Sequence, residues 1–226
     1  MIRAADVRRV RFGTIVRPAD ESADGRSRVE ALDGFVVPFG DGLLLFDTGI
    51  GAGDADVDAH YRPQRIPLPD ALGRVGATPD EVTAVANCHL HLDHAGGNPA
   101  LAGRPVLVQR AELELARSGE HTIDGLTDFP GARYEVLDGE TVIAPGLLLV
   151  PTPGHTAGHQ CLLVETDEGG LLLAGQTHDT ASGWTADVEG IRRADADVPP
   201  PPVWMPALLD RVVEARFAHD AAIWHA

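Results

Sequence analysis

The chain has 226 residues, enough for one domain, 1–226, with a substantial buried core. Its 34 acidic residues outnumber its 18 basic residues, and the formal net charge is −16. This charge repels nucleic-acid backbones and anionic membrane surfaces, so we expect no nucleic acid and no membrane as partners. The N-terminus lacks a long apolar stretch, and no run approaches the roughly 18 apolar residues of a membrane span, which predicts a cytoplasmic protein.

The first third of the chain is predicted to be rich in β-structure. Residues 34–39 and 43–46 form the two strands of a hairpin around the turn Gly40-Asp41-Gly42. Residues 18–30 are polar and predict a loop. A strand at 7–16, an irregular excursion at 56–69 and a short helix at 68–75 are also expected.

The strongest signal follows an apolar, strand-like run at residues 82–86. The next residues include His89-x-His91-x-Asp93-His94, which places four metal-capable side chains within six residues. The glycines that come next allow the backbone to turn sharply. His89 and His91 can aim at one ion, whereas Asp93 and His94 can aim at a second. This pattern predicts a metal site at the edge of a sheet, with further ligands supplied by the rest of the chain.

The remainder of the chain mixes short strands with helices. A helix is predicted at residues 110–118, ended by Gly119, and a hairpin at 160–165 and 170–174. Strands are also expected at 105–108, 135–137, 141–143, 147–150 and 215–219, and a last helix at 203–214. The strands fall into two groups, each followed by helical segments, which favours two packed β-sheets with helices outside.

Three of these later strands also end in segments with metal-capable or polar side chains. Each segment follows an apolar run, as the first motif does. We therefore expect these groups to cluster with the first motif at one edge of the sheets. Their polar residues are His155, His159, Gln176, His178, Asp179 and His219.

The two cysteines, Cys88 and Cys161, are isolated and lie in apolar, strand-like surroundings. Free cysteine is among the most buried residue types, so we expect both thiols to be buried and reduced. Neither belongs to a Cys-x-x-Cys pair, so the sequence indicates no thiolate zinc site.

Several of these motifs together resemble the metallo-β-lactamase superfamily. They are His89-x-His91-x-Asp93-His94, Pro153-Gly154-His155-Thr156-x-Gly158-His159, the terminal His219 and Asp47-Thr48-Gly49. They occur in the expected order across residues 35–220. The resemblance implies an αββα four-layer sandwich of α/β (α+β) class. The shorter strings 108–112 and 155–160 look most like the N-acyl homoserine lactonase group.

Carried over to this chain, the resemblance implies two metal sites. One ion would be held by His89, His91 and His155, and the other by Asp93, His94 and His219. Zinc suits such ligands, with one Zn²⁺ firmly bound and a second expected, although iron, cobalt or manganese can occupy such sites. A metal-activated hydroxide would be the nucleophile. Asp93 would be the catalytic residue that orients it, and Asp47 would fix a ligand imidazole from behind.

Two positions depart from the pattern of the lactonase relatives. Gln176 stands where the superfamily places a metal-bridging aspartate, and as a ligand it would supply only a neutral amide oxygen. We therefore expect the Asp93-His94-His219 metal to bind more weakly than in aspartate-bearing relatives. His178 or Asp179 is an alternative source of the missing ligand. Asp179 also stands where lactonase relatives carry a tyrosine that contacts the substrate carbonyl, and an ionised carboxylate cannot donate that hydrogen bond.

The ligand set predicts a metal-dependent hydrolase of a small ester, lactone or thioester, with lactonase activity and quorum quenching implied by the resemblance. His178 and Asp179 are candidate residues of the substrate pocket. The alternative is a metal-binding but catalytically impaired regulatory or ligand-binding member of the same fold, which Gln176 and Asp179 motivate. The expected partner is a small-molecule substrate, and a homodimer is compatible with the sequence.

Overall fold

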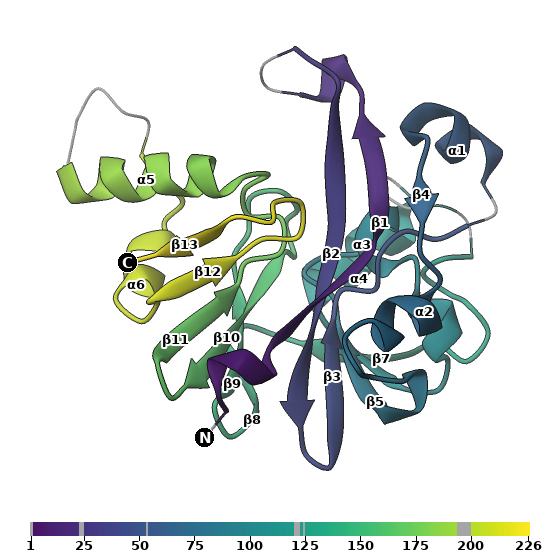
Figure 1. The fold of residues 1–226 in the computed structure, drawn as a ribbon, viewed down its shortest axis with the longest axis horizontal. Coiled ribbons are helices and arrows are strands. Elements are labelled where there is room, and N and C mark those ends of the chain that lie inside the picture. The colour runs from purple at the N-terminus through teal and green to yellow at the C-terminus, as the bar shows by residue number, and fades with distance from the viewer. Residues whose placement is uncertain (1, 23–24, 53, 120–122, 124, 194–199) are drawn as a thin grey trace.

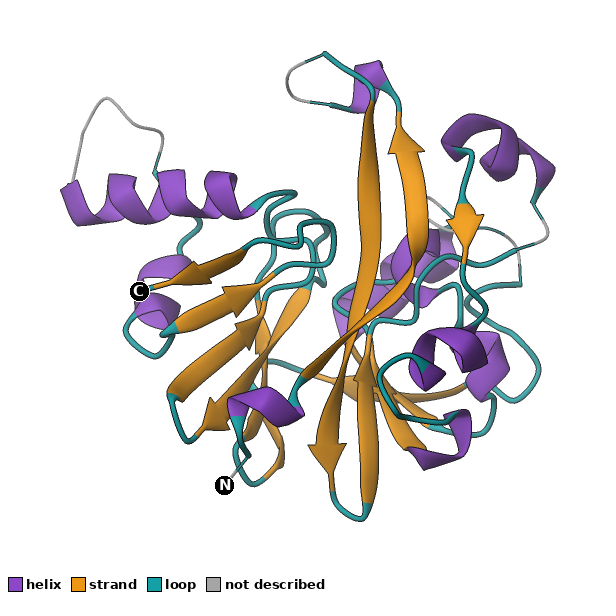
Figure 2. Ribbon diagram, in the orientation of Figure 1, coloured by secondary structure: helices purple, strands orange, loops and turns teal. Residues whose placement is uncertain are grey.

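The computed structural model describes residues 2–22, 25–52, 54–119, 123, 125–193 and 200–226. Across these residues the strands form two sheets that face each other (Figure 1). The larger sheet has the order β4-β1-β2-β3-β5-β6-β7, and the smaller has the order β13-β12-β11-β10-β9-β8. Helices lie on the outer side of each sheet, so the layers run helix, sheet, sheet, helix (Figure 2). This is the predicted αββα sandwich, and the prediction is confirmed.

The larger sheet joins an antiparallel half to a parallel half. β1, β2 and β3 pair in antiparallel fashion, and β3, β5, β6 and β7 pair in parallel. The parallel strands bring their carboxyl ends to one edge, where the first metal-capable motif follows β5. The strands are β1 (Arg8–Arg17), β2 (Arg28–Phe39), β3 (Gly42–Phe46), β4 (Gln64–Arg65), β5 (Val82–Ala86), β6 (Pro105–Gln109) and β7 (Arg133–Leu137).

The smaller sheet is antiparallel except for one pair, β11 with β12. That parallel pair directs the chain after β11 and the chain after β12 to the same edge. Its strands are β8 (Thr141–Ala144), β9 (Leu147–Pro151), β10 (Gln160–Thr166), β11 (Gly169–Leu173), β12 (Glu214–Arg216) and β13 (Ile223–His225).

The helices are short, and most of them connect consecutive strands. None in the described part of the chain is long and apolar enough to cross a membrane. They are α1 (Ala55–Tyr61), α2 (Leu68–Gly73), α3 (Leu92–Ala95), α4 (Arg110–Ser118), α5 (Ala181–Arg193) and α6 (Met205–Leu209).

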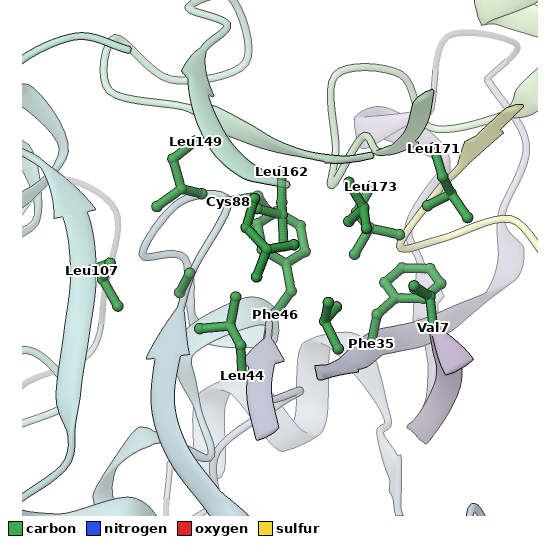
Figure 3. Packing of buried hydrophobic residues seen from close by; sticks show 14 of the residues in the cluster. Val7, Phe35, Leu44, Phe46, Cys88, Leu107, Leu149, Leu162, Leu171 and Leu173 are labelled. Carbon is green, nitrogen blue, oxygen red and sulfur yellow. The ribbon is translucent and has the colours of Figure 1, made fainter. Parts of the chain in front are cut away.

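The core follows from the two-residue period of the strands, which sends alternate side chains to opposite faces. In β3, Leu44 and Phe46 face the smaller sheet, while Leu45 packs outward under α2. In β10, Leu162 faces the larger sheet, while Leu163 packs outward against α5 and α6. Figure 3 shows the resulting layer of leucine and phenylalanine side chains between the sheets. β3 and β10 are therefore apolar on both faces, as a strand buried between a sheet and a helix must be.

Two segments predicted to be irregular are in fact ordered elements. β2 begins at Arg28, inside the predicted loop 18–30, because Arg17 on β1 pairs with Glu30 on β2 and extends the hairpin. The predicted excursion 56–69 contains α1 and β4. Asp54 begins α1 by accepting hydrogen bonds from the backbone N–H groups of Asp56 and Val57.

The C-terminal predictions were partly wrong. The helix expected at 203–214 is shorter and consists of α6 alone. Val213 N–H donates to Gly170 O, and Glu214 already belongs to β12, so the helix cannot extend to 214. The strand expected at 215–219 ends at Arg216. Beyond it the chain crosses toward the larger sheet, where Asp33 N–H donates to Ala218 O at 2.9 Å. The sequence reading also missed β13 and α5.

Candidate metal centre

The predicted ligands come from loops of both sheets. The larger sheet supplies Asp47 directly after β3 and the first motif directly after β5. The smaller sheet supplies His155 after β9, Gln176 after β11 and His219 after β12. The loops that follow its strands turn toward the larger sheet (Figure 2). The predicted cluster at one edge of the two sheets is therefore present.

The first group of donors is His89, His91 and His155. One ring nitrogen from each lies within 4.8 Å of the others, and His155 Nε2 is 3.2 Å from His91 Nδ1. His89 Nε2 is buried and makes no hydrogen bond with any described residue. A buried imidazole nitrogen without a hydrogen bond is costly unless something else coordinates it. The three imidazoles therefore fit a cation ligated by nitrogen.

The second group is Asp93, His94, Gln176 and His219. His94 Nε2 is 3.1 Å from both Gln176 Oε1 and His219 Nε2. Asp93 Oδ2 is 3.7 Å from His94 Nε2 and 3.6 Å from His219 Nε2. Ligand atoms around a tetrahedral Zn²⁺, with bonds of 2.0–2.2 Å, lie about 3.3–3.6 Å apart. These spacings therefore fit one ion with nitrogen and oxygen ligands.

Hydrogen bonds behind the second group fix which ring nitrogen faces it. His94 Nδ1–H donates to Asp47 Oδ2 at 3.0 Å, and Asp47 Oδ1 accepts from the Cys88 backbone N–H at 2.8 Å. His219 Nδ1–H donates to Ala31 O at 2.8 Å. Both rings thus present Nε2 to the cluster, which is the arrangement of metal-ligating histidines. The contact between Asp47 and His94 is the one predicted for a residue that orients an imidazole.

His159 is buried, and both of its ring nitrogens are already engaged. Its Nε2 accepts from the Gln176 backbone N–H at 3.2 Å, so Nδ1 carries the proton and donates to Thr152 Oγ1 at 2.8 Å. A ring with two protein partners has no lone pair left for a metal. The structure therefore places His159 in a supporting position under Gln176.

Both thiols are buried and free, as predicted. Cys88 Sγ lies 3.1 Å from His89 Nδ1 and 3.3 Å from His94 Nδ1, directly behind both groups of donors. Burial, reinforced by the nearby Asp47 carboxylate, raises the pKa of Cys88 well above its usual value. The thiol therefore stays protonated at neutral pH, and in that form it is a poor metal ligand.

Gln176, His178 and Asp179 make different contacts, and only two of the three lie at the cluster. The Gln176 amide nitrogen donates to Asp179 Oδ1 at 3.2 Å, which leaves its carbonyl oxygen toward His94. His178 turns elsewhere, with Nε2 3.0 Å from Asp187 Oδ2 and its ring against Trp184. Asp179 therefore lies beside the cluster, whereas His178 does not contact the described ligands.

A cavity of about 310 Å³ opens over the two groups of donors. Its floor contains ligands from both groups, and its walls combine apolar side chains with an arginine, a glutamate and a tyrosine. No sequence pattern had indicated that Ile15, Arg17 or Glu21 belongs to the site. The lining residues are Ile15, Arg17, Glu21, Ile50, Tyr61, His91, Leu92, Asp93, His155 and Gln176.

The protonation states of the second group are coupled. Burial alone would lower the pKa of His94, but Asp93 and Asp47 outweigh it and raise the pKa to about 9. Burial alone would raise the pKa of Asp93, but His94 and His219 lower it to about 2. Burial and the neighbouring His94 lower the pKa of His219. In the metal-free protein at neutral pH, His94 is therefore an imidazolium between two carboxylates.

Metal binding at this group must therefore displace a proton from His94. At pH 6.5, where water on zinc is still largely protonated, we expect close to one proton to be released as the second ion binds. Calorimetric titration in buffers of different ionisation enthalpy measures this number directly. The share of this count that comes from His94 should fall toward zero as the pH rises through 9, where water on the ion supplies the released proton instead. A binding enthalpy that is independent of the buffer at pH 6.5 contradicts the assignment.

The same shift predicts the pH dependence of stability in the metal-free protein. The folded-state pKa of His94 is about 9, above the usual 6.5, so protonation favours the folded state. This contribution is fully present below pH 6.5 and is lost as the pH rises through 9.

Glu112, in the first turn of α4, ties together the two loops that carry the first group. Its buried carboxylate accepts from Leu90 N–H at 2.8 Å and from the Thr156 hydroxyl at 2.6 Å. Leu90 lies between His89 and His91, and Thr156 follows His155. Sequence reasoning used this glutamate only as part of the family resemblance. The sequence feature that could have singled out Glu112 is its position in the first turn of an amphipathic helix.

Replacing Glu112 with alanine should weaken the first metal site by about 10- to 100-fold, the usual effect of losing a group that orients ligands. Competition with a chromophoric zinc chelator measures the affinity. Glu112→Gln keeps the size and one acceptor oxygen, so it should recover part of the affinity. Thr156→Val removes one of the two contacts and should fall between the wild type and Glu112→Ala. Unchanged affinity in Glu112→Ala contradicts this role.

The fold and the convergent donors place the protein in a class defined by the metallo-hydrolase fold. The Metallo-beta-lactamase superfamily model matches residues 33–212, and the chain belongs to that superfamily. Among curated proteins it is 42% identical to an N-acyl homoserine lactonase of Bacillus cereus over 102 residues, 45% of this chain and 40% of the relative. It is 35% identical to an N-acyl homoserine lactonase of Rhizobium radiobacter over 115 residues, 46% of this chain and 44% of that relative. The matches thus span less than half of these relatives.

Solved structures of lactonases share the fold over nearly the whole chain. An N-acyl homoserine lactone hydrolase with its product bound at the catalytic metal centre superposes with a TM-score of 0.78 at 22% identity, covering 98% of this chain and 94% of that chain. A dizinc quorum-quenching lactonase, AidC, superposes with a TM-score of 0.63 at 16% identity, covering 89% and 77%. The predicted resemblance to N-acyl homoserine lactonases is confirmed, because lactonases are among the similar proteins both in sequence and in fold.

Proposed function

We propose that this protein is a metal-dependent hydrolase of a small ester, lactone or thioester. The observation that carries the proposal is the convergence of two donor groups on the floor of one cavity. His89, His91 and His155 would hold one Zn²⁺, and Asp93, His94, His219 and Gln176 would hold a second. Bound divalent ions would polarise the substrate carbonyl and lower the pKa of a water molecule.

The side chains of this chain would orient the reaction around that chemistry. Asp93 is ionised at neutral pH because its pKa is about 2, so it can accept a hydrogen bond from the attacking water. Asp47 holds the His94 ring, and Glu112 holds the loops of His89 and His155. The apolar walls formed by Ile15, Ile50 and Leu92 would exclude bulk water.

The size of the cavity supports a small substrate. A volume of about 310 Å³ is at the lower end for ligand pockets, which run from about 300 to 1,000 Å³. Lactones come first among the candidates because the curated relatives are lactonases. Hydrolysis of N-acyl homoserine lactones would make the protein a quorum-quenching enzyme.

A panel of N-acyl homoserine lactones, simple lactones, aryl esters and thioesters tests the proposal on zinc-loaded protein. We expect turnover of at least one class, lost on chelation and restored by adding zinc. Failure to hydrolyse any member of the panel, with zinc content verified, contradicts it.

A second candidate is a metal-binding member of the fold that has lost turnover and binds a regulatory ligand. The observation that favours it is the neutral amide of Gln176 among the second group of donors. Substitution at Gln176 separates the two candidates, as argued in the Discussion.

A further inference from the structure

Arg17, the last residue of β1, lies in the wall of the cavity above the predicted ligands. Its Nε donates to Glu30 Oε2 at 2.7 Å, and its Nη1 reaches Glu21 Oε2 at 3.5 Å. Its Nη2 donates to no side chain or carbonyl in the described part of the chain. A guanidinium has five N–H donors, so Arg17 retains hydrogen-bonding capacity for a ligand in the cavity.

A chain of hydrogen bonds fixes this guanidinium and links it to Gln176. The buried Glu30 carboxylate also accepts from Arg28 Nε at 2.6 Å. Arg28 Nη2 in turn donates to Asp179 Oδ2 at 2.8 Å, and Asp179 Oδ1 accepts from the Gln176 amide. The two residues that depart from the lactonase pattern are therefore part of the network that holds Arg17.

The charges around Arg17 favour a neutral acceptor over an anion. Glu30 and Glu21 already compensate the guanidinium, and Asp93 and Asp179 are close enough to stabilise its charged form. Arg17 and Arg28 carry two positive charges against the three negative charges of Glu21, Glu30 and Asp179, so this network offers a substrate carboxylate no net attraction. A carbonyl oxygen carries no net charge and can accept an N–H bond without such an attraction.

We propose that Arg17 is a specificity-determining residue that donates a hydrogen bond to a neutral carbonyl oxygen in the acyl part of the substrate, beside the scissile ester. This inference rests on the proposed hydrolase function.

The test compares two lactones that differ in one acceptor. An α-acylamino-γ-butyrolactone carries the carbonyl oxygen, and an α-alkyl-γ-butyrolactone of equal chain length does not. In Arg17→Met we expect kcat/KM to fall about 10- to 100-fold for the acylamino lactone, the usual cost of losing a hydrogen bond from a charged donor. The alkyl lactone should lose much less. Arg17→Lys, which keeps the charge and a donor, should show a smaller selective loss.

Arg133→Met is the matched control, because it removes an exposed arginine that pairs with Glu135 on β7 and does not line the cavity. It should leave kcat/KM for both lactones nearly unchanged. An equal loss for both lactones in Arg17→Met, or the same selectivity change in Arg133→Met, overturns the assignment. If Arg17→Met does not fold, the same comparison on Arg17→Lys decides. If the wild type hydrolyses neither lactone nor any other panel member, the proposed function fails first, and the inference fails with it.

Discussion

Replacing His155 with alanine is expected to lower kcat/KM by at least about 1,000-fold and to reduce the zinc content by about one ion per chain. His155 would supply one of three imidazoles to the first site, and a catalytic ion contributes several kcal/mol of transition-state stabilisation. Its ring packs against those of His89 and His91, with centroids 4.6 and 4.9 Å away. This partial burial, together with His94, lowers its pKa to about 4, so it is ready to ligate at neutral pH.

The residue as a whole is solvent-exposed, so its loss should leave the fold intact. Elemental analysis after gel filtration gives the metal content, and circular dichroism checks the fold. His225→Ala is the matched control, because His225 is also exposed and its nearest acidic oxygen, on Glu214, is 4.0 Å away. Full metal content and activity in His155→Ala contradict the proposed first site.

Replacing Gln176 with aspartate is expected to tighten the second ion by more than about tenfold. Asp93 is the only carboxylate among the predicted ligands, and an added negative charge near a divalent cation is strongly favourable in a buried site. Competitive metal titration measures the affinity. Activity then separates the two candidate functions. A large gain in kcat/KM favours an impaired member of the family, whereas a fall shows that Gln176 belongs to a working site.

Gln176→Asn separates charge from length. It shortens the side chain as aspartate does but adds no charge, so it should not tighten the second ion. Asp179 should reduce the gain from Gln176→Asp. Its Oδ1 accepts from the Gln176 amide in the wild type, and in the variant it would face a second carboxylate. Gln176→Asp combined with Asp179→Asn removes that repulsion and should bind the ion more tightly still. Equal affinities in wild type and both aspartate variants contradict the role of charge.

The sheets were predictable because their strands are apolar and closely bounded by turn residues. The prediction for β5 matches the structure residue for residue, and α4 begins and ends where Arg110 and Gly119 indicated. The metal-capable cluster was predictable for a related reason. Its members follow strands, and strand ends meet at sheet edges whatever the details of packing.

The contacts that assemble the site could not be read from the chain. Glu112 reaches Leu90 across 22 positions, and Arg28 reaches Asp179 across 151, so no local pattern reveals either pair. β13 was missed because it is three residues long and is defined only by its pairing with β12. α5 contains glycine and threonine and is positioned by Trp184, which is fully buried against the smaller sheet.

The ligands of each proposed ion come from both sheets, and this has a consequence for the integrity of the whole molecule. His89 and His91 belong to the larger sheet and His155 to the smaller, so a bound ion cross-links the two halves without a covalent bond. Such an ion binds the folded chain and not the separated sheets, so free zinc should raise the melting temperature by mass action. Zinc scarcity would then act on the lifetime of the protein as well as on its chemistry.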